Sequence, residues 1–283
     1  MTLIDGRAIS ASLKESLAAE VKTFPEKYGR VPHLVVVRVG EDPASVVYVR
    51  NKAKACAEVG IRNTTIVKDE STSEEDFLSL IRELNADDTV DGILVQLPLP
   101  RHISEAKVIE TIDRSKDVDG VHPYNVAGLW QKTPHMEPCT PKGIMHLLRA
   151  SGIDPKGKRA VVIGRSNIVG LPVAKMLLDA NATVTLCHSR TVDMPSVTRQ
   201  AEILVVAIGR PKMITGDMVS DGVVVIDVGM DMDPETGKLC GDVDFDSVAT
   251  KATAITPVPG GVGPMTIACL MQNTVECFLA KVS

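Results

Sequence analysis

The stretch VIGRSNIVGLP occupies residues 162–172 and decides the fold of the second half of the chain. An apolar run leads into it, and residues 169–178 have the spacing of an amphipathic helix. A glycine-rich turn between a strand and a helix is suited to dinucleotide phosphates, because the free N–H groups at the helix start attract anions. The usual motif is GxGxxG, but Ser166 stands in place of the middle glycine and Gly170 comes one residue later than the motif requires. The turn is either a cofactor loop or an ordinary strand-to-helix connection.

Strands and helices alternate on both sides of this turn, which favours parallel sheets covered by helices and predicts an α/β protein. The predicted strands are residues 33–39, 61–67, 91–97, 158–163, 183–187, 203–207 and 223–227. Helices are predicted from Arg7 to near Pro25, over 43–59, over 169–178, near Pro195, near Thr215 and after Pro257. Another helix begins either at Thr72 with Glu75 or at Ser73 with Asp76.

The turn-rich segments 116–125 and 133–143 interrupt the alternation, and the proline density of this region predicts a domain junction. We therefore expect two α/β domains. The first is residues 1–140, joined by the C-terminal helix at about 265–283, and the second is a Rossmann-like domain of residues 141–264.

The composition narrows the functional classes. Of the 283 residues, 44% are apolar, 24% charged and 3% aromatic, which indicates a globular protein with an aliphatic core. A net charge of −5 without long runs of one sign argues against nucleic acids or membranes as partners. The six cysteines form no CxxC pair, no histidine cluster has metal-ligand spacing, and the N-terminus has no signal-peptide pattern, so we expect a cytoplasmic protein without a metal.

The strand after the glycine-rich turn indicates which dinucleotide would bind. It ends in LCHSRT, residues 186–191, where an NAD site usually carries an acid for the ribose hydroxyls. Ser189 and Arg190 stand there instead, and Arg165 lies in the turn itself. Guanidinium groups bind phosphate in bidentate fashion, so these residues favour NADP over NAD.

Tyr48 and Lys52 are four residues apart on the helix predicted over 43–59 and so share a face. In most proteins, such a pair is simply a tyrosine that packs beside the core and a lysine that extends into solvent. The same YxxxK spelling occurs in short-chain dehydrogenases, but there it follows the cofactor loop, whereas here it precedes residue 164 by more than a hundred positions.

Three further polar or glycine-rich positions are candidates for a site. Gln96 and Asp119 stand where ligands gather, outside the carboxyl ends of strands. A satisfied core amide is the alternative for Gln96, and a role in stabilising the turn is equally compatible with Asp119. Pro259, Gly260 and Gly261 precede the last helix, either as a flexible turn or as backbone that approaches a ligand closely.

Taken together, these motifs resemble those of the bifunctional methylenetetrahydrofolate dehydrogenase/methenyltetrahydrofolate cyclohydrolase family. The similar strings occur in order along nearly the whole chain: YVRNKAKACAEVGI, GILVQLPLP, KDVDGVHPYN, PCTPKG, VVIGRSNIVGLPVA, CHSRT and PVPGGVGPMT. The resemblance implies a homodimer of two-domain subunits, with NADP on the second domain and a tetrahydrofolate derivative in a cleft between the domains. It also favours the cofactor-loop interpretation of residues 162–172.

The resemblance implies roles for individual residues. Lys52 is the implied catalytic lysine, with Gln96 in contact with it, Tyr48 near the pterin and Asp119 bound to the pterin. The implied NADP contacts are Gly164, Arg165, Ser166, Ser189, Arg190 and Met230, and Pro259, Gly260 and Gly261 are implied to contact substrate. Met230-Asp231 replaces the Ile-Asn that is common in the family, and we expect little effect from Met230.

The implied chemistry is oxidation of 5,10-methylenetetrahydrofolate by NADP, followed by hydrolysis of the methenyl product to 10-formyltetrahydrofolate, a step of one-carbon metabolism that supplies purine biosynthesis. Burial can lower the pKa of a lysine, and a neutral neighbour such as Gln96 holds the amine without restoring its charge, so Lys52 is suited to be the general base. The alternative is a dinucleotide-sensing module without catalysis, for which the second domain alone would suffice.

Overall fold

The computed structural model describes residues 1–133, 135–234 and 236–282. The chain divides into two compact units, each assembled from two segments. Ser12–Cys139 and the residues from Ile267 on form one, which we call the Lys52 unit, and Met1–Ala11 with Thr140–Thr266 form the other, the Gly164 unit. Two helices contribute residues to both units: α1 (Gly6–Val21) and α11 (Val262–Val282).

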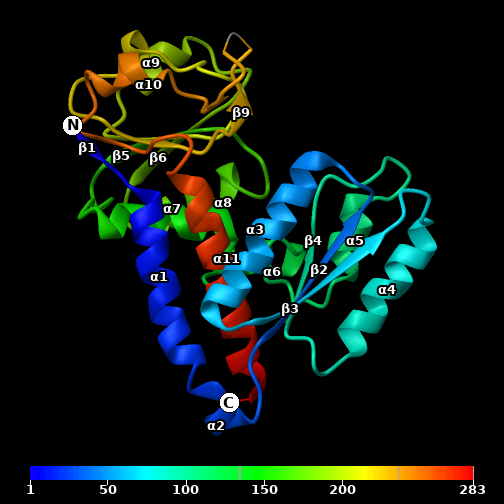
Figure 1. Ribbon diagram of the computed structural model, residues 1–283. Coiled ribbons are helices and arrows are strands. Elements are labelled where there is room, and N and C mark those ends of the chain that lie inside the picture. The colour runs from blue at the N-terminus through cyan, green and yellow to red at the C-terminus, as the bar shows by residue number, and fades with distance from the viewer. Residues whose placement is uncertain (134, 235, 283) are drawn as a thin grey trace. The chain divides into compact units, whose positions relative to one another are not determined.

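The Lys52 unit is built on a parallel three-stranded sheet in the order β3-β2-β4. Helix α3 covers one face, and α4 and α5 cover the other (Figure 1). The seven residues of β2 are all buried, and Val35 and Val37 pack with Phe77 of α4. The elements are α2 (Phe24–Tyr28), β2 (His33–Val39), α3 (Pro43–Val59), β3 (Arg62–Lys68), α4 (Glu74–Ala86), β4 (Gly92–Val95), α5 (Glu105–Thr111) and α6 (Pro123–Gln131).

The start of each long helix in this unit follows from local sequence. The side chain of Asp42 accepts a hydrogen bond from the N–H of Ser45 at the first turn of α3, and Gly60 ends α3 with a φ of 88°. At α4, Ser73 rather than Thr72 is the N-terminal cap, and its Oγ accepts from the N–H of Asp76 at 3.1 Å. This geometry selects the second of the two predicted starts, because the side chain satisfies a backbone donor that the helix cannot.

The Gly164 unit contains a six-stranded sheet in the order β1-β11-β8-β7-β5-β6, parallel throughout. The strand order reverses at β5, and ligands of such sheets bind outside the carboxyl ends of the strands at that point. The sheet strands are β1 (Thr2–Leu3), β5 (Arg159–Ile163), β6 (Thr183–Cys187), β7 (Ile203–Val206), β8 (Val224–Asp227) and β11 (Ala254–Ile255), and a separate antiparallel pair is β9 (Asp231–Met232) with β10 (Leu239–Cys240). The helices are α7 (Cys139–Ala150), α8 (Gly170–Asp179), α9 (Met194–Thr198), the 3-10 helix η1 (Gly216–Met218) and α10 (Phe245–Ala249).

The predicted α/β class and the predicted long strands are confirmed, but several details differ from the expectation. The proline-rich region 116–143 contains α6, because Pro123 occupies the first turn, where no donor is lost, and Nδ1 of His122 accepts from the N–H of Tyr124. Pro25 lies inside α2 rather than at the end of α1, and the helix expected near Thr215 is only the short η1.

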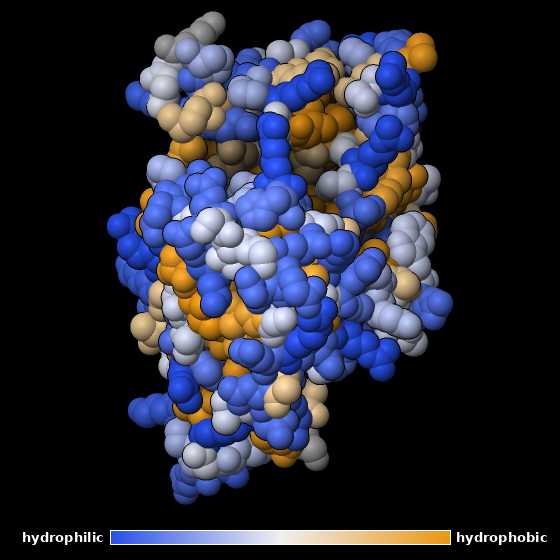
Figure 2. Space-filling model, turned by 90° about the vertical axis from the view of Figure 1, so that its right-hand side faces the viewer, coloured by the Kyte–Doolittle hydropathy of each residue, from blue (hydrophilic) through white to orange (hydrophobic). Residues whose placement is uncertain are grey.

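The N-terminus also departs from the expected division of the chain. Met1–Ala11 belong to the Gly164 unit, because β1 pairs in parallel with β11. Two-residue strands carry too little periodicity to be recognised in a sequence. Among the described residues, no helix combines the length and the apolar character that crossing a bilayer requires. On the face drawn in Figure 2, hydrophilic side chains predominate and apolar ones form smaller patches.

Candidate active site and cofactor loop

Lys52 and Gln96 are in direct contact in the Lys52 unit. Nζ of Lys52, on α3, donates to Oε1 of Gln96 at 2.9 Å. Gln96 directly follows β4, where its N–H donates to the carbonyl of Val37, and its Nε2 donates to the carbonyl of Leu97 at 2.7 Å. The amide is therefore held at both ends, and its oxygen is presented to the lysine.

The surroundings of Lys52 favour its neutral form. Burial lowers the pKa of Lys52, and the electrostatic influence of Asp119 and of Cys139 opposes that shift. Burial in turn raises the pKa of Asp119, which nearby Lys52 lowers and Asp117 raises. The predicted residues Lys52, Gln96 and Asp119 thus form one electrostatic group, in which the amine contacts a neutral acceptor rather than a carboxylate.

The loop that carries Asp119 is organised by a different acid. Oδ2 of Asp117 accepts from the N–H of His122 and from Nδ2 of Asn125, each at 2.7 Å, and Oδ1 accepts from the N–H of Gly120 at 3.1 Å. Asp117 is 2% exposed and supplies the bonds that close this turn. The turn-stabilising role considered for Asp119 is therefore filled by Asp117, which was not among the predicted site residues.

Tyr48 lies one helical turn before Lys52 on α3, as its spacing predicts. Its side chain is 36% exposed, and partial burial raises the pKa of its hydroxyl. This position leaves an aromatic surface open beside the Lys52 group. A contact between that ring and a pterin stays a prediction.

The geometry of the turn after β5 explains why its sequence departs from the GxGxxG motif. Gly164 has a φ of 122°, and a Cβ there would lie 2.2 Å from the carbonyl oxygen of Ala207. A Cβ on Gly170 would lie 2.2 Å from the carbonyl oxygen of Gly164, so the late glycine allows the first turn of α8 to pack against the loop. Two of the glycines are therefore required by close backbone contacts within the protein.

Ser166 takes the place of the middle glycine, and its side chain accepts hydrogen bonds from two N–H groups where α8 begins. Its Oγ accepts from the N–H of Val169 at 3.2 Å and from that of Gly170 at 3.3 Å. A hydroxyl has two acceptor lone pairs and one donor, so these bonds leave its proton as a donor for a ligand oxygen. The turn fits a phosphate at the start of α8, where the helix dipole also favours negative charge.

The residues expected to select NADP lie at the same edge of the sheet. Ile163 pairs with Cys187 in the parallel ladder of β5 and β6, so Arg165 and Ser189 each stand two residues beyond a paired position. Arg165, Ser189 and Arg190 are all exposed. The N–H of Arg190 donates to Nδ1 of His188 at 3.1 Å, which fixes the backbone of this turn. Two guanidinium groups and a hydroxyl fit a ribose phosphate.

Met230 follows β8, and the turn that leads to it is held by an acid that was not predicted. Oδ1 of Asp227 accepts from the N–H groups of Gly229 at 2.9 Å and Asp242 at 3.0 Å, and Oδ2 accepts from that of Val243. Burial raises the pKa of Asp227 to about 7, against the effect of these donors. Met230 is 41% exposed and available for contact. In Asp231, Oδ2 is buried without a hydrogen-bond partner, and burial raises its pKa.

The glycines at 260 and 261 have a structural cause. A Cβ on Gly261 would lie 2.7 Å from the carbonyl oxygen of Pro257, and Gly260 has a φ of 116°. The N–H of Arg7 also donates to the carbonyl of Gly260 at 3.1 Å. Two backbone segments therefore meet here, which requires small residues. A substrate contact from Pro259, Gly260 and Gly261 stays a prediction.

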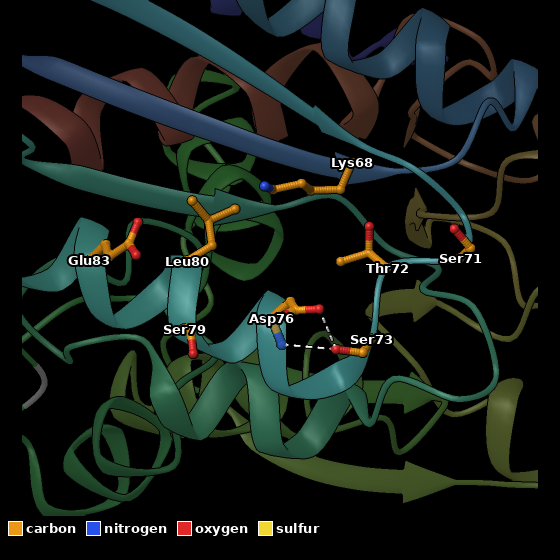
Figure 3. Close-up of a pocket in the computed structure, with 8 residues that line it drawn as sticks. All are labelled: Lys68, Ser71, Thr72, Ser73, Asp76, Ser79, Leu80 and Glu83. Atoms are coloured by element: carbon orange, nitrogen blue, oxygen red, sulfur yellow. Dashed lines mark hydrogen bonds between the residues drawn. The ribbon is translucent and has the colours of Figure 1, made fainter.

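A surface hollow beside α4 lies apart from these residues. Figure 3 shows Ser73 bonded to Asp76 at the helix start, with Lys68 extending from β3 above it. Its lining contains none of the predicted site residues, and it includes Ser73, the N-terminal cap of α4. Within the described ranges, no group of three or more His, Cys, Asp or Glu side chains is placed to hold a metal ion.

Comparisons with known proteins agree with this arrangement. The model of the tetrahydrofolate dehydrogenase/cyclohydrolase catalytic domain matches residues 4–119, and that of the NAD(P)-binding domain matches residues 138–282. The bifunctional protein FolD of Magnetococcus marinus is 57% identical over 274 residues, 97% of this chain and 96% of that protein.

Solved structures are similar over the whole chain. The bifunctional FolD methylenetetrahydrofolate dehydrogenase/cyclohydrolase of Campylobacter jejuni is 50% identical, with a TM-score of 0.96 over 99% of both chains. The FolD of Trypanosoma brucei, solved with NADP cofactor and inhibitor, is 40% identical, with a TM-score of 0.95 over 100% of this chain and 98% of that one. The chain belongs to the tetrahydrofolate dehydrogenase/cyclohydrolase family.

Proposed function

We propose that this protein oxidises 5,10-methylenetetrahydrofolate with NADP and then hydrolyses the methenyl product to 10-formyltetrahydrofolate. The observation that carries the proposal is the bond between Nζ of Lys52 and the neutral amide of Gln96 in a place where burial lowers the pKa of the lysine. A dinucleotide-binding module would have no use for such an amine. Family membership supplies the substrate class.

The chain's own residues supply binding and proton transfer. Gly164, Arg165, Ser166, Ser189, Arg190 and Met230 are the proposed NADP contacts. When bound, NADP accepts two electrons with a hydrogen from the methylene carbon of the folate. Correct positioning alone can lower such a barrier by about 7 to 11 kcal/mol. Tyr48 and Asp119 are proposed to bind the pterin, with Pro259, Gly260 and Gly261 as further substrate contacts.

The hydrolytic step needs a base. Water adds to the methenyl carbon and gives a proton to the neutral amine of Lys52. The bond from that carbon to N5 then breaks, as the carbinol hydroxyl loses its proton and N5 takes one up from the Lys52 ammonium, which leaves the formyl group on N10. Gln96 orients the amine without stabilising its charged form, since its acceptor carries no full charge. A positioned base of this kind contributes about 10²- to 10⁴-fold.

One assay tests both activities. Protein is mixed with 5,10-methylenetetrahydrofolate and NADP, and absorbance is followed at the wavelengths of the reduced nicotinamide and of the methenyl group. The nicotinamide signal should rise, and the methenyl signal should rise and then decay. Binding of NADP without either signal would instead identify a sensing module.

Replacing both Arg165 and Arg190 with alanine should erode the preference for NADP over NAD. A charge-assisted hydrogen bond contributes about 1.5 to 3 kcal/mol, and the exposed position favours the lower value, so each loss should cost about tenfold. The measurement is the ratio of kcat/KM for the two cofactors. Arg159→Ala, at the opposite end of β5, is the matched control, and an unchanged ratio in the double variant would reject the assignment.

We also propose a homodimer, formed along the edge of the six-stranded sheet. β6 is an edge strand with exposed residues, among them Leu186, which is 38% exposed, and Leu178 at the end of α8 is 51% exposed. An unprotected edge with apolar side chains is a template for pairing with a second chain. The six cysteines are scattered and form no CxxC pair, which favours a reducing compartment. We place the protein in the cytoplasm, in the one-carbon metabolism that supplies purine biosynthesis, without a nucleic-acid or membrane partner.

Leu186→Glu should convert the dimer into monomers, because it adds a charge to this edge. Light scattering behind gel filtration at micromolar concentration measures the mass. Leu239→Glu, at a leucine on β10 that is 45% exposed, should leave the mass unchanged. A dimeric Leu186→Glu protein would place the interface elsewhere.

A further inference from the structure

Asn273 is a fully buried amide in the apolar helix α11, with an exposed fraction of 0%. Its Nδ2 donates to the carbonyls of Val118 and Glu137, each at 2.9 Å, and lies 3.4 Å from Sγ of Cys139. A buried amide costs stability unless its bonds are made, and an apolar residue would serve the helix equally well. The hydrogen bonds of Asn273 therefore fix the segments that contain Val118 and Glu137, rather than helix α11 itself.

Those segments hold Asp119 on both sides. Val118 contributes the carbonyl that precedes Asp119, and this oxygen also accepts from Sγ of Cys139 at 3.2 Å. The carbonyl of Asp119 itself accepts from the N–H of Cys139 at 3.2 Å. The two peptide groups that flank the Cα of Asp119 are therefore both fixed, one by Asn273 with Cys139 and the other by Cys139 with Asp117.

We propose that Asn273 is a positioning residue for folate binding, which acts by holding the Val118–Asp119 peptide so that the Asp119 carboxylate faces the pterin. The inference rests on the proposed function, which assigns the pterin contact to Asp119. It adds a residue 154 positions away in the sequence that touches neither substrate nor cofactor. Asp117 closes the same loop from within, whereas Asn273 anchors it to α11.

The test measures the KM for 5,10-methylenetetrahydrofolate, the KM for NADP and kcat in Asn273→Ala, Asn273→Ser and Asp119→Asn. A displacement of about 1 Å at a binding group can cost about 100-fold, so Asn273→Ala should raise the folate KM by about 10- to 100-fold. The NADP KM should stay within about twofold. Asn273→Ser, which keeps one donor, should give an intermediate folate KM.

Thr274→Val is the matched control. Thr274 is buried to the same degree in α11, but its hydroxyl donates to the carbonyl of Leu270 within the helix. This variant should lower the melting temperature without changing the folate KM. If Asn273→Ala does not fold, Asn273→Ser decides the question.

The double variant Asn273→Ala/Asp119→Asn distinguishes a failure of the proposed positioning role from a failure of the proposed pterin contact. If Asn273 acts through Asp119, then Asn273→Ala should change the folate KM by less than about twofold in the Asp119→Asn background. A full effect in that background, or an unchanged folate KM in both Asn273 variants while Asp119→Asn raises it, would overturn the positioning role. An unchanged folate KM in Asp119→Asn itself would instead refute the proposed pterin contact.

Discussion

Lys52→Met is expected to lower cyclohydrolase activity by about 10²- to 10⁴-fold, because it removes the proposed general base. Methionine nearly preserves the length of the side chain but cannot accept a proton. The proposed NADP contacts all come from other segments of the chain, so the affinity for NADP should be nearly intact. The measurements are hydrolysis of 5,10-methenyltetrahydrofolate, which bypasses the first reaction, and titration of the protein with NADP.

Lys54 provides the control for this experiment. It lies two residues further along α3, but its side chain is 77% exposed and its nearest partner, Glu58, is 4.0 Å away. Lys54→Met makes the same substitution on the same helix and should leave hydrolysis unchanged. An equal loss of hydrolysis and of NADP binding in Lys52→Met would indicate a role in folding and would contradict the catalytic assignment.

Local signals in the sequence predict the elements that carry the site. The valine run of β2 can be recognised in the sequence, and so can Asp42 and Gly60 at the two ends of α3, because each acts within a few residues of its own position. Strand alternation then places Gln96 outside the carboxyl end of β4. The contact between Lys52 and Gln96 joins residues 44 positions apart, and its expectation came from the family resemblance rather than from periodicity.

What sequence reasoning missed depends on contacts between distant segments. The pairing of β1 with β11 joins residues at the two ends of the chain, and each strand is only two residues long. Asn273 interrupts an apolar helix, which is a visible signal, but its acceptors lie more than a hundred residues earlier. Hydrogen bonds of this kind leave no period in the sequence, so only coordinates identify the partners.

Gln96→Glu should move the pH at which cyclohydrolase activity is half-maximal upward by about 1 to 3 units. Burial lowers the pKa of Lys52, and activity requires the neutral amine, so the rate rises as pH rises through that pKa. A carboxylate in place of the amide oxygen, 2.9 Å from Nζ, would stabilise the ammonium form and raise the pKa. At neutral pH the rate should therefore fall by about 10- to 10³-fold and recover at higher pH.

The neutral substitution Gln96→Met separates charge from geometry. It removes the acceptor without adding a charge, so it should lower kcat at every pH, with the rise at the original pH or below it. The test is the pH profile of methenyltetrahydrofolate hydrolysis for both variants and the unsubstituted protein. If the Gln96→Glu profile rises at the same pH as that of Gln96→Met and does not recover in alkali, the protonation state of Lys52 is not what Gln96 controls. The amide would then act by orientation alone, and the pKa argument for a lysine base would lose its support.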